Sequence, residues 1–357
     1  MWRLRSRISV KPSQSLSISI VILFAFYLST TKIASAQASL EWLNVDGSLR
    51  SFAVHLPIDY DSRRKYPVVV LLHGSGETAE DIERLSHFDF VADRYGFIAF
   101  YPNSNGTRWD VGGAPAAANR PSGRKGGLGN MGPRIPFPLP DGEGAEKNGN
   151  QDKNPLGDVK FLNQMLDKLA QTYSVDPNRI FATGYSDGGI MDFRLGCSMS
   201  SRIAAIAPVA AAMPKEMSLH CEPSRAIPLL MINGTSDPVV HFGGGRLRET
   251  TLTILPVKTT AEKWAELDRC ALKPTQTELP PHNKEGLKTI LNTYGDCRDG
   301  AEVALYTIEG GGNTWPSGDK ILPEKEVGKT STDLDTDEVM WKFFSAHPMP
   351  ASSSVGK

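Results

Sequence analysis

The sequence lacks the long runs of basic residues that would indicate a nucleic-acid-binding surface. Its 39 lysines and arginines are balanced by 40 acidic residues, and the formal net charge is −1. We therefore expect no nucleic-acid partner. Charged residues make up 22% and hydrophobic residues 40% of the 357 residues, which is typical of a globular protein and argues against disorder.

Cysteine is scarce and forms no C-x-x-C pattern, and no histidine cluster accompanies it. This argues against a zinc site. The even number of cysteines predicts two disulfides in an exported protein, with two pairs of free thiols as the alternative. Pairing of neighbours is the simplest of three connectivities, and it joins Cys197 to Cys221 and Cys270 to Cys297.

The N-terminal apolar run, Ile18 to Leu28, is too short for a comfortable membrane span. Basic residues precede it, and Ala34-Ser35-Ala36 follows with the small residues of a cleavage site. Residues 1–36 are therefore interpreted as a secretory signal peptide, with an uncleaved anchor helix as the alternative. We expect a secreted or periplasmic protein that has no membrane contact after cleavage.

Strand and helix patterns alternate along the rest of the chain. Asp46-Gly47 predicts a tight turn between two short strands, and Pro67–Leu72 is typical of a strand buried on both faces. Further strands are predicted at 96–101, 180–183, 204–209, 228–232 and 303–308, and helices at 79–95, 157–173, 188–197, 259–267 and 334–345. The pattern predicts a single α/β domain at 37–357, with a mainly parallel sheet covered by helices on both faces.

One stretch, from about 111 to 154, breaks this alternation. It is rich in glycine, proline, alanine and asparagine and is too long for an ordinary connection. A loop on the substrate side and an insertion without a function explain it equally well.

The strongest functional signal is the G-x-S-x-G motif at residues 184–188. It follows a predicted strand and opens a predicted helix, the context of a nucleophile elbow, so Ser186 is predicted to be a nucleophile. Gly184 and Gly188 are needed because a Cβ at either position would collide with neighbouring backbone.

Two backbone N–H groups are predicted to form an oxyanion hole beside this serine. One belongs to Ser75, within the His73-Gly74-Ser75-Gly76 segment after the strand at 67–72, and the other to Asp187. His73 itself is interpreted as structural. A nucleotide-binding loop is excluded because no third glycine follows Gly76.

Asp237 follows the strand at 228–232, in the place of a triad acid that orients a histidine. We call residues 235–241 the acid loop. The strand at 303–308 leads into the segment EGGGNTWP, where chain order places the base, but the residue there is Asn313. A carboxamide nitrogen is not basic and cannot accept the serine proton.

Together these motifs resemble the secreted polyhydroxybutyrate depolymerase and feruloyl esterase family, carbohydrate esterase family 1, of the α/β-hydrolase superfamily. The resemblance covers nearly the whole mature chain and is carried by HGSG, by residues 176–189, by GTSDPVV and by EGGGNTWP. It implies an α/β-hydrolase fold and ester hydrolysis through an acyl-serine intermediate without a cofactor. It also implies Ser186 as nucleophile and Asp237 as acid, whereas the family's last motif reads G-G-G-H-T-W-P, so Asn313 stands at the position of the base.

Three explanations of Asn313 remain. In the first, the chain is a weak or silent enzyme that binds an ester or a carbohydrate. In the second, another histidine, such as His241 on the acid loop, has replaced the base. In the third, this copy carries a change that its relatives lack.

The expected substrates are feruloyl or acetyl esters of plant polysaccharide, or short hydroxyalkanoate esters, small or polymeric. Trp109, Trp315 and His241 are predicted to line the substrate pocket.

Overall fold

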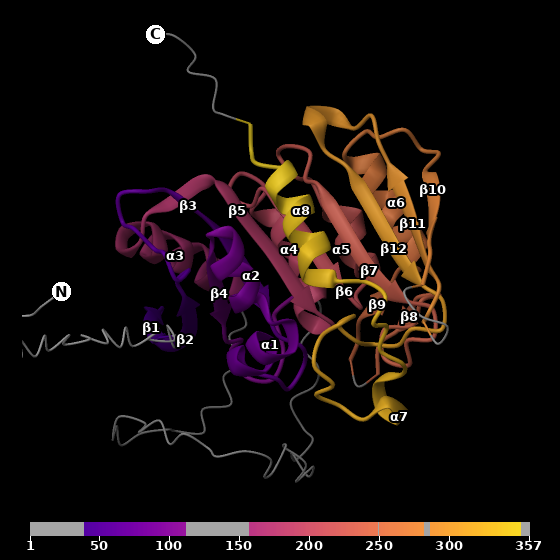
Figure 1. Cartoon of the computed structure of the whole chain (residues 1–357), viewed down its shortest axis with the longest axis horizontal. Helices are drawn as coiled ribbons and strands as arrows, with labels where there is room; N and C mark the ends of the chain where they lie inside the picture. The colour runs from indigo at the N-terminus through magenta and orange to yellow at the C-terminus, as the bar shows by residue number, and fades with distance from the viewer. Residues whose placement is uncertain (1–38, 112–156, 249, 282–285, 351–357) are drawn as a thin grey trace, which may run out of the picture. The chain divides into compact units, whose positions relative to one another are not determined.

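The computed structural model describes residues 39–111, 157–248, 250–281 and 286–350 (Figure 1). The predicted signal peptide and nearly all of the predicted insertion at about 111–154 lie outside these described residues. Within the described ranges, no helix has the length and apolar character needed to cross a membrane.

A ten-stranded sheet forms the centre of the fold, in the order β1-β2-β4-β3-β5-β6-β7-β12-β11-β10. The strands from β4 to β12 in this order run parallel, and the strands at both ends are antiparallel. This confirms the mainly parallel sheet predicted from the sequence. Its strands are β1 (Ser39–Val45), β2 (Ser48–His55), β3 (Tyr66–Leu72), β4 (Ile98–Pro102), β5 (Val175–Tyr185), β6 (Ala205–Val209), β7 (Leu229–Gly234), β10 (Thr275–Leu279), β11 (Thr289–Tyr294) and β12 (Val303–Ile308); β8 (Gly245–Arg246) and β9 (Thr253–Ile254) pair separately.

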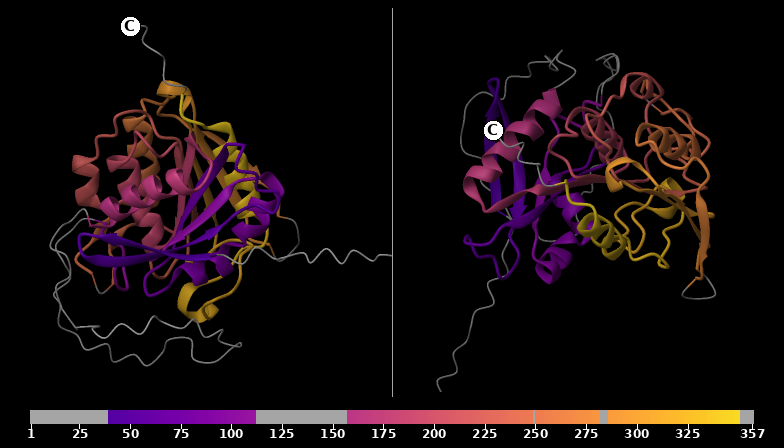
Figure 2. Two further views of the ribbon diagram at one scale, coloured as in Figure 1. Left: turned by 90° about the vertical axis from the view of Figure 1, so that its left-hand side faces the viewer. Right: turned by 90° about the horizontal axis from the view of Figure 1, so that it is seen from above.

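Helices cover both faces of the sheet, as Figure 2 shows, and apolar side chains form a core on each face. Phe161, Phe193 and Trp264 of α3, α4 and α6 pack on one face, and Phe88 and Phe344 of α2 and α8 pack on the other. The helices are α1 (Ala79–Ser86), α2 (Phe88–Tyr95), α3 (Gly157–Thr172), α4 (Asp187–Ser198), α5 (Lys215–His220), α6 (Val257–Leu267), α7 (Glu324–Val327) and α8 (Thr336–Ala346), with a short 3₁₀ turn, η1 (Arg298–Gly300).

The structure divides the helix predicted at 79–95 into α1 and α2. His87 separates them in a left-handed conformation, with φ 53°. The sequence also gave no signal for β10 and β11, because β10 is mostly exposed and polar, with the sequence TQTEL. A solvated antiparallel edge lacks the apolar run that revealed the central strands.

The predicted hairpin and both predicted disulfides are confirmed. Asp46 and Gly47 take φ values of 51° and 84°, as a tight two-residue turn between β1 and β2 requires. Cys197 is bonded to Cys221, and Cys270 to Cys297. The first disulfide closes a loop that contains β6 and α5, and the second closes a loop that contains the antiparallel strands β10 and β11.

Candidate active site

Ser186 lies on the turn between β5 and α4 with φ 54° and ψ −109°, a strained conformation for a residue with a Cβ. Its N–H donates to Val209 O at 2.9 Å, and its carbonyl accepts from Ile190 N at 3.0 Å. These two bonds fix the turn, and Ser186 remains half-buried with access to solvent. The geometry is that of a nucleophile elbow.

The two glycines of the motif are required for the reason inferred from the sequence. A Cβ on Gly184 would lie 2.4 Å from the carbonyl carbon of Gly188. One on Gly188 would lie 2.1 Å from Leu72 O and 2.7 Å from His73 O. The start of α4 therefore packs backbone to backbone against the end of β3.

Asp237 lies in the acid loop after β7 and is 4% exposed. One carboxylate oxygen accepts from the N–H groups of Val239 and Val240, both at 2.7 Å, and the other accepts from Asn313 Nδ2 at 2.7 Å. Burial raises the pKa of Asp237 to about 6, although these three hydrogen bonds favour the charged form. The carboxyl group is therefore mainly ionised at neutral pH.

Asn313 follows β12 and is 2% exposed. Its N–H donates to Val327 O at 2.6 Å, and its carbonyl accepts from the Tyr185 hydroxyl at 2.7 Å. A carboxylate can only accept, so the amide nitrogen must face Asp237. Asn313 thus makes the hydrogen bond to Asp237 that the Nδ1–H of a histidine at this position would make, but its amide has no basic atom.

The loop at residues 73–77, here called the oxyanion loop, holds the N–H of Ser75 between two backbone N–H groups that have acceptors. Gly74 N donates to Glu77 Oε2 at 2.8 Å, and Gly76 N donates to Thr107 O at 2.7 Å. Ser75 N, between them, has no acceptor among the described residues. Burial raises the pKa of Glu77 to about 7, while its bond from Gly74 opposes the rise.

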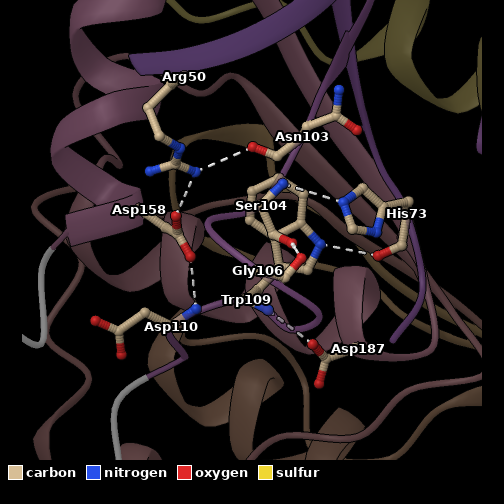
Figure 3. Close-up of polar contacts among 9 residues, drawn as sticks. All are labelled: Arg50, His73, Asn103, Ser104, Gly106, Trp109, Asp110, Asp158 and Asp187. Atoms are coloured by element: carbon tan, nitrogen blue, oxygen red, sulfur yellow. Dashed lines mark hydrogen bonds and ion pairs between the residues drawn. The ribbon is translucent and has the colours of Figure 1, made fainter. Parts of the chain in front are cut away.

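His73 is structural, as interpreted from the sequence. It is 1% exposed, and its Nε2 accepts from Ser104 N at 3.1 Å (Figure 3). Since an amide N–H can only donate, Nδ1 carries the ring hydrogen and donates to Gly74 O at 2.8 Å. Burial lowers the pKa of His73, so the ring is neutral and both nitrogens are occupied.

Trp109 lies beneath the site rather than on a pocket surface, which differs from the expectation. It is 3% exposed, its indole Nε1 donates to His73 O at 2.8 Å, and its backbone N donates to Asp187 Oδ2 at 2.9 Å (Figure 3). The other Asp187 oxygen pairs with Arg108. Sequence reasoning missed these links because the partners lie 36 and 78 positions away in the chain.

The other two residues expected at the substrate pocket lie in different environments. His241 is exposed, and its Nδ1 lies 3.2 Å from the backbone oxygen of Asp237. Trp315 is 1% exposed; its indole N–H donates to Asp337 at 2.8 Å, and its ring packs edge-on against Phe88. Trp315 is therefore a core residue on the face covered by α2 and α8, which corrects the expectation.

No group of three or more histidine, cysteine, aspartate or glutamate side chains in the described ranges could hold a metal ion. An open cleft of about 540 Å³ lies beside the acid loop, and Ser186 is not among the residues that line it. It is lined by Ser236, Leu287, Gly310, Glu324, Lys325, Gly328 and Lys329.

Comparisons with known proteins find esterases. Residues 143–267 match the family model described as phospholipase/carboxylesterase, and residues 50–110 match the one described as esterase PHB depolymerase. Feruloyl esterase B of Piromyces equi is 35% identical over 161 residues, which cover 44% of this chain but only 28% of that protein. Feruloyl esterase D of Neurospora crassa is 23% identical over 85% of this chain and 83% of its own length.

Among solved structures, an acetyl xylan esterase from Aspergillus awamori aligns with a TM-score of 0.53 and 15% identity. The alignment covers 86% of this chain and 99% of that one. At this identity the likeness establishes the fold alone. The fold is the one expected from the sequence, with a parallel sheet and the elbow between β5 and α4.

Proposed function

Since this chain is an esterase-type member of the α/β-hydrolase superfamily, we propose that it hydrolyses carboxylic esters through an acyl-serine intermediate on Ser186. Asn313 limits the rate, because it occupies the position of the catalytic base. No cofactor takes part in this proposal.

In the proposed reaction, Ser186 Oγ attacks the ester carbonyl carbon, and the carbonyl oxygen becomes an oxyanion. The N–H groups of Ser75 and Asp187 stabilise that negative charge. The alcohol then leaves. In the second half-reaction, water attacks the acyl carbon, and the carboxylic acid and free Ser186 are released. Each half-reaction needs a group that accepts a proton from the nucleophile and delivers it to the leaving group, and Asn313 cannot do so.

The observation that carries the proposal is the 2.7 Å hydrogen bond between Asn313 Nδ2 and Asp237. It joins the position of the base to the acid with the geometry that a histidine would need. Of the usual parts of a serine hydrolase, this arrangement lacks only the basic nitrogen.

The names of the relatives support a substrate class. Feruloyl esterases and an acetylxylan esterase are among them, so we propose feruloyl or acetyl esters of plant polysaccharide as substrates. Short hydroxyalkanoate esters are the second class, supported by the match to the PHB depolymerase family model. The two disulfides support export to the cell exterior or the periplasm.

A second function is a binding protein that holds an ester or carbohydrate without hydrolysing it. The close fit of Asn313 favours it, because the side chain, the N–H and the carbonyl of this buried residue are all hydrogen-bonded. Such an arrangement is stable without a base.

The deciding experiment is Asn313→His, assayed with a chromogenic acetate ester. Loss of the base alone costs a serine hydrolase about 10⁶-fold in kcat, so we expect its return to raise turnover by at least about 10³-fold. Ser186→Ala in the same background should abolish the gain. If the natural protein is already fast and His241→Ala silences it, His241 is the base. If neither form hydrolyses simple esters, the binding function is favoured.

A further inference from the structure

The two proposed oxyanion donors come from segments that are far apart in the chain. Ser75 lies on the oxyanion loop after β3, and Asp187 is the first residue of α4. Donors stabilise a developing oxyanion only when both lie about 3 Å from the same oxygen atom. Something must therefore fix the distance between the loop and the helix.

We propose that Trp109 is a positioning residue that fixes these two N–H groups relative to each other. The inference rests on the proposed ester hydrolysis at Ser186. Trp109 binds both segments at once, because its indole N–H donates to His73 O and its backbone N–H donates to the Asp187 carboxylate. No ligand or metal is required for this role.

The contact with His73 is made where the two segments meet. The same His73 oxygen faces the start of α4, where a Cβ on Gly188 would lie 2.7 Å from it. The indole N–H therefore holds a carbonyl that lies between the oxyanion loop and the helix. The rings of Trp109 and His73 also pack together, with centroids 5.0 Å apart.

Trp109 is itself held by the contacts of the residues on both sides of it. The preceding residue, Arg108, pairs with Asp187. The following residue, Asp110, donates its N–H to Asp158 at 2.7 Å, and Asp158 forms a buried ion pair with Arg50 at 2.6 Å (Figure 3). These bonds tie the segment to β2 and α3, so the indole presents its N–H from a rigid base.

The oxyanion loop has little freedom of its own to compensate. Gly74 N is taken by Glu77, and Gly76 N by Thr107, which lies on the same segment as Trp109. A loop held in this way points Ser75 N in one direction. These bonds keep the shape of the loop, so loss of the indole bond would displace the loop as a unit, and the N–H of Ser75 could not reorient to compensate.

The test is Trp109→Phe, which keeps an aromatic ring but removes the indole N–H. Trp264→Phe is the matched control. Trp264 is also buried, and its Nε1 donates at 2.8 Å to the carbonyl of Ile227, which precedes β7 and so lies at the opposite end of the parallel strands from Ser186. Both variants lose one buried indole–carbonyl hydrogen bond of the same length, so their losses of stability should be similar.

Turnover is measured in the Asn313→His background. A misplaced donor acts mainly in the transition state, so we expect Trp109→Phe to lower kcat roughly 10- to 100-fold with little change in KM. Trp264→Phe should leave both constants near those of the parent. Trp109→benzothienylalanine, in which sulfur replaces the N–H without a change of shape, should reproduce the loss if the phenylalanine variant folds poorly.

Phenylboronic acid provides a readout that needs no base. Ser186 Oγ bonds to boron, the serine proton passes to solvent, and an oxygen of the anionic adduct takes the oxyanion position. In the natural chain, we expect Trp109→Phe to weaken this binding by a factor similar to its loss of kcat, and Trp264→Phe to have no effect.

Equal effects of the two variants on binding and turnover would overturn the role of Trp109. If the natural chain binds no boronic acid and Asn313→His gains no activity, the proposed function fails, and this inference fails with it.

Discussion

Under the proposed function, the pair Asp237 and Asn313 separates what a side chain does for structure from what it does for catalysis. The amide donates to the carboxylate and keeps it hydrogen-bonded at a position where both side chains are almost closed to water. An unpaired buried carboxylate would destabilise the fold, so replacement of a histidine by a non-donor would be costly. Asparagine avoids that cost and still removes the basic atom. The acid loop is therefore intact although the proposed chemistry is weakened.

Backbone crowding at Gly188 gives a prediction at the residue scale. In Gly188→Ala, the new methyl group would lie 2.1 Å from Leu72 O, and neither backbone can move without separating α4 from β3. We expect a loss of roughly 1–3 kcal/mol in the free energy of unfolding, as is usual for overpacking, measured by urea denaturation. Gly243→Ala is the control, because a Cβ at Gly243 meets nothing within 4 Å. Equal stability of the two variants would contradict this prediction.

At the scale of elements, the sequence was most informative where the chain is buried. The parallel strands β3, β6 and β12 and the elbow before α4 follow from apolar runs and from one motif. The break at His87 escaped prediction because a left-handed residue is normally signalled by glycine or asparagine. The positions of Trp109 and Trp315 escaped for another reason: their hydrogen-bond partners are set by tertiary packing, which periodicity does not report.

The helix that follows the oxyanion loop gives a prediction at this scale. α1 begins at a capping box in which the Thr78 side chain accepts from Asp81 N and the Asp81 carboxylate accepts from Thr78 N. Thr78→Ala removes the first of these bonds and should lower the free energy of unfolding by about 1 kcal/mol, measured in urea. Thr78→Ser keeps the hydroxyl and should stay close to the parent. A serine variant as unstable as the alanine variant would show that the methyl group, not the cap, matters.

For the molecule as a whole, the buried carboxyl groups predict how stability depends on pH. Burial is the first cause of a raised pKa at several of them, in places as different as the acid loop, the oxyanion loop and α8. These are Asp237 (about 6), Glu77 and Asp268 (about 7), and Glu83 and Asp337 (about 8). Such groups hold protons in the folded state that they release on unfolding at the same pH. Their joint effect favours the folded state on the acid side of neutrality.

Asp337 allows this effect to be tested with one substitution. Its folded pKa of about 8 lies above the unfolded value of 3.8, so its stabilising effect is complete below about pH 4 and is lost as the pH rises toward 8. The free energy of unfolding, measured by urea denaturation, should therefore fall between pH 5 and pH 8.

Asp337→Asn keeps an oxygen that accepts from the Trp315 indole but has no proton to lose. The free energy of unfolding of this variant should therefore fall less steeply with pH, by the equivalent of at most one proton. Asp59→Asn, which replaces an exposed carboxyl group, should leave the slope of the parent protein unchanged. If the parent protein and Asp337→Asn show the same slope, the buried carboxyl group at Asp337 is ionised in the folded protein, and the pH dependence has another origin.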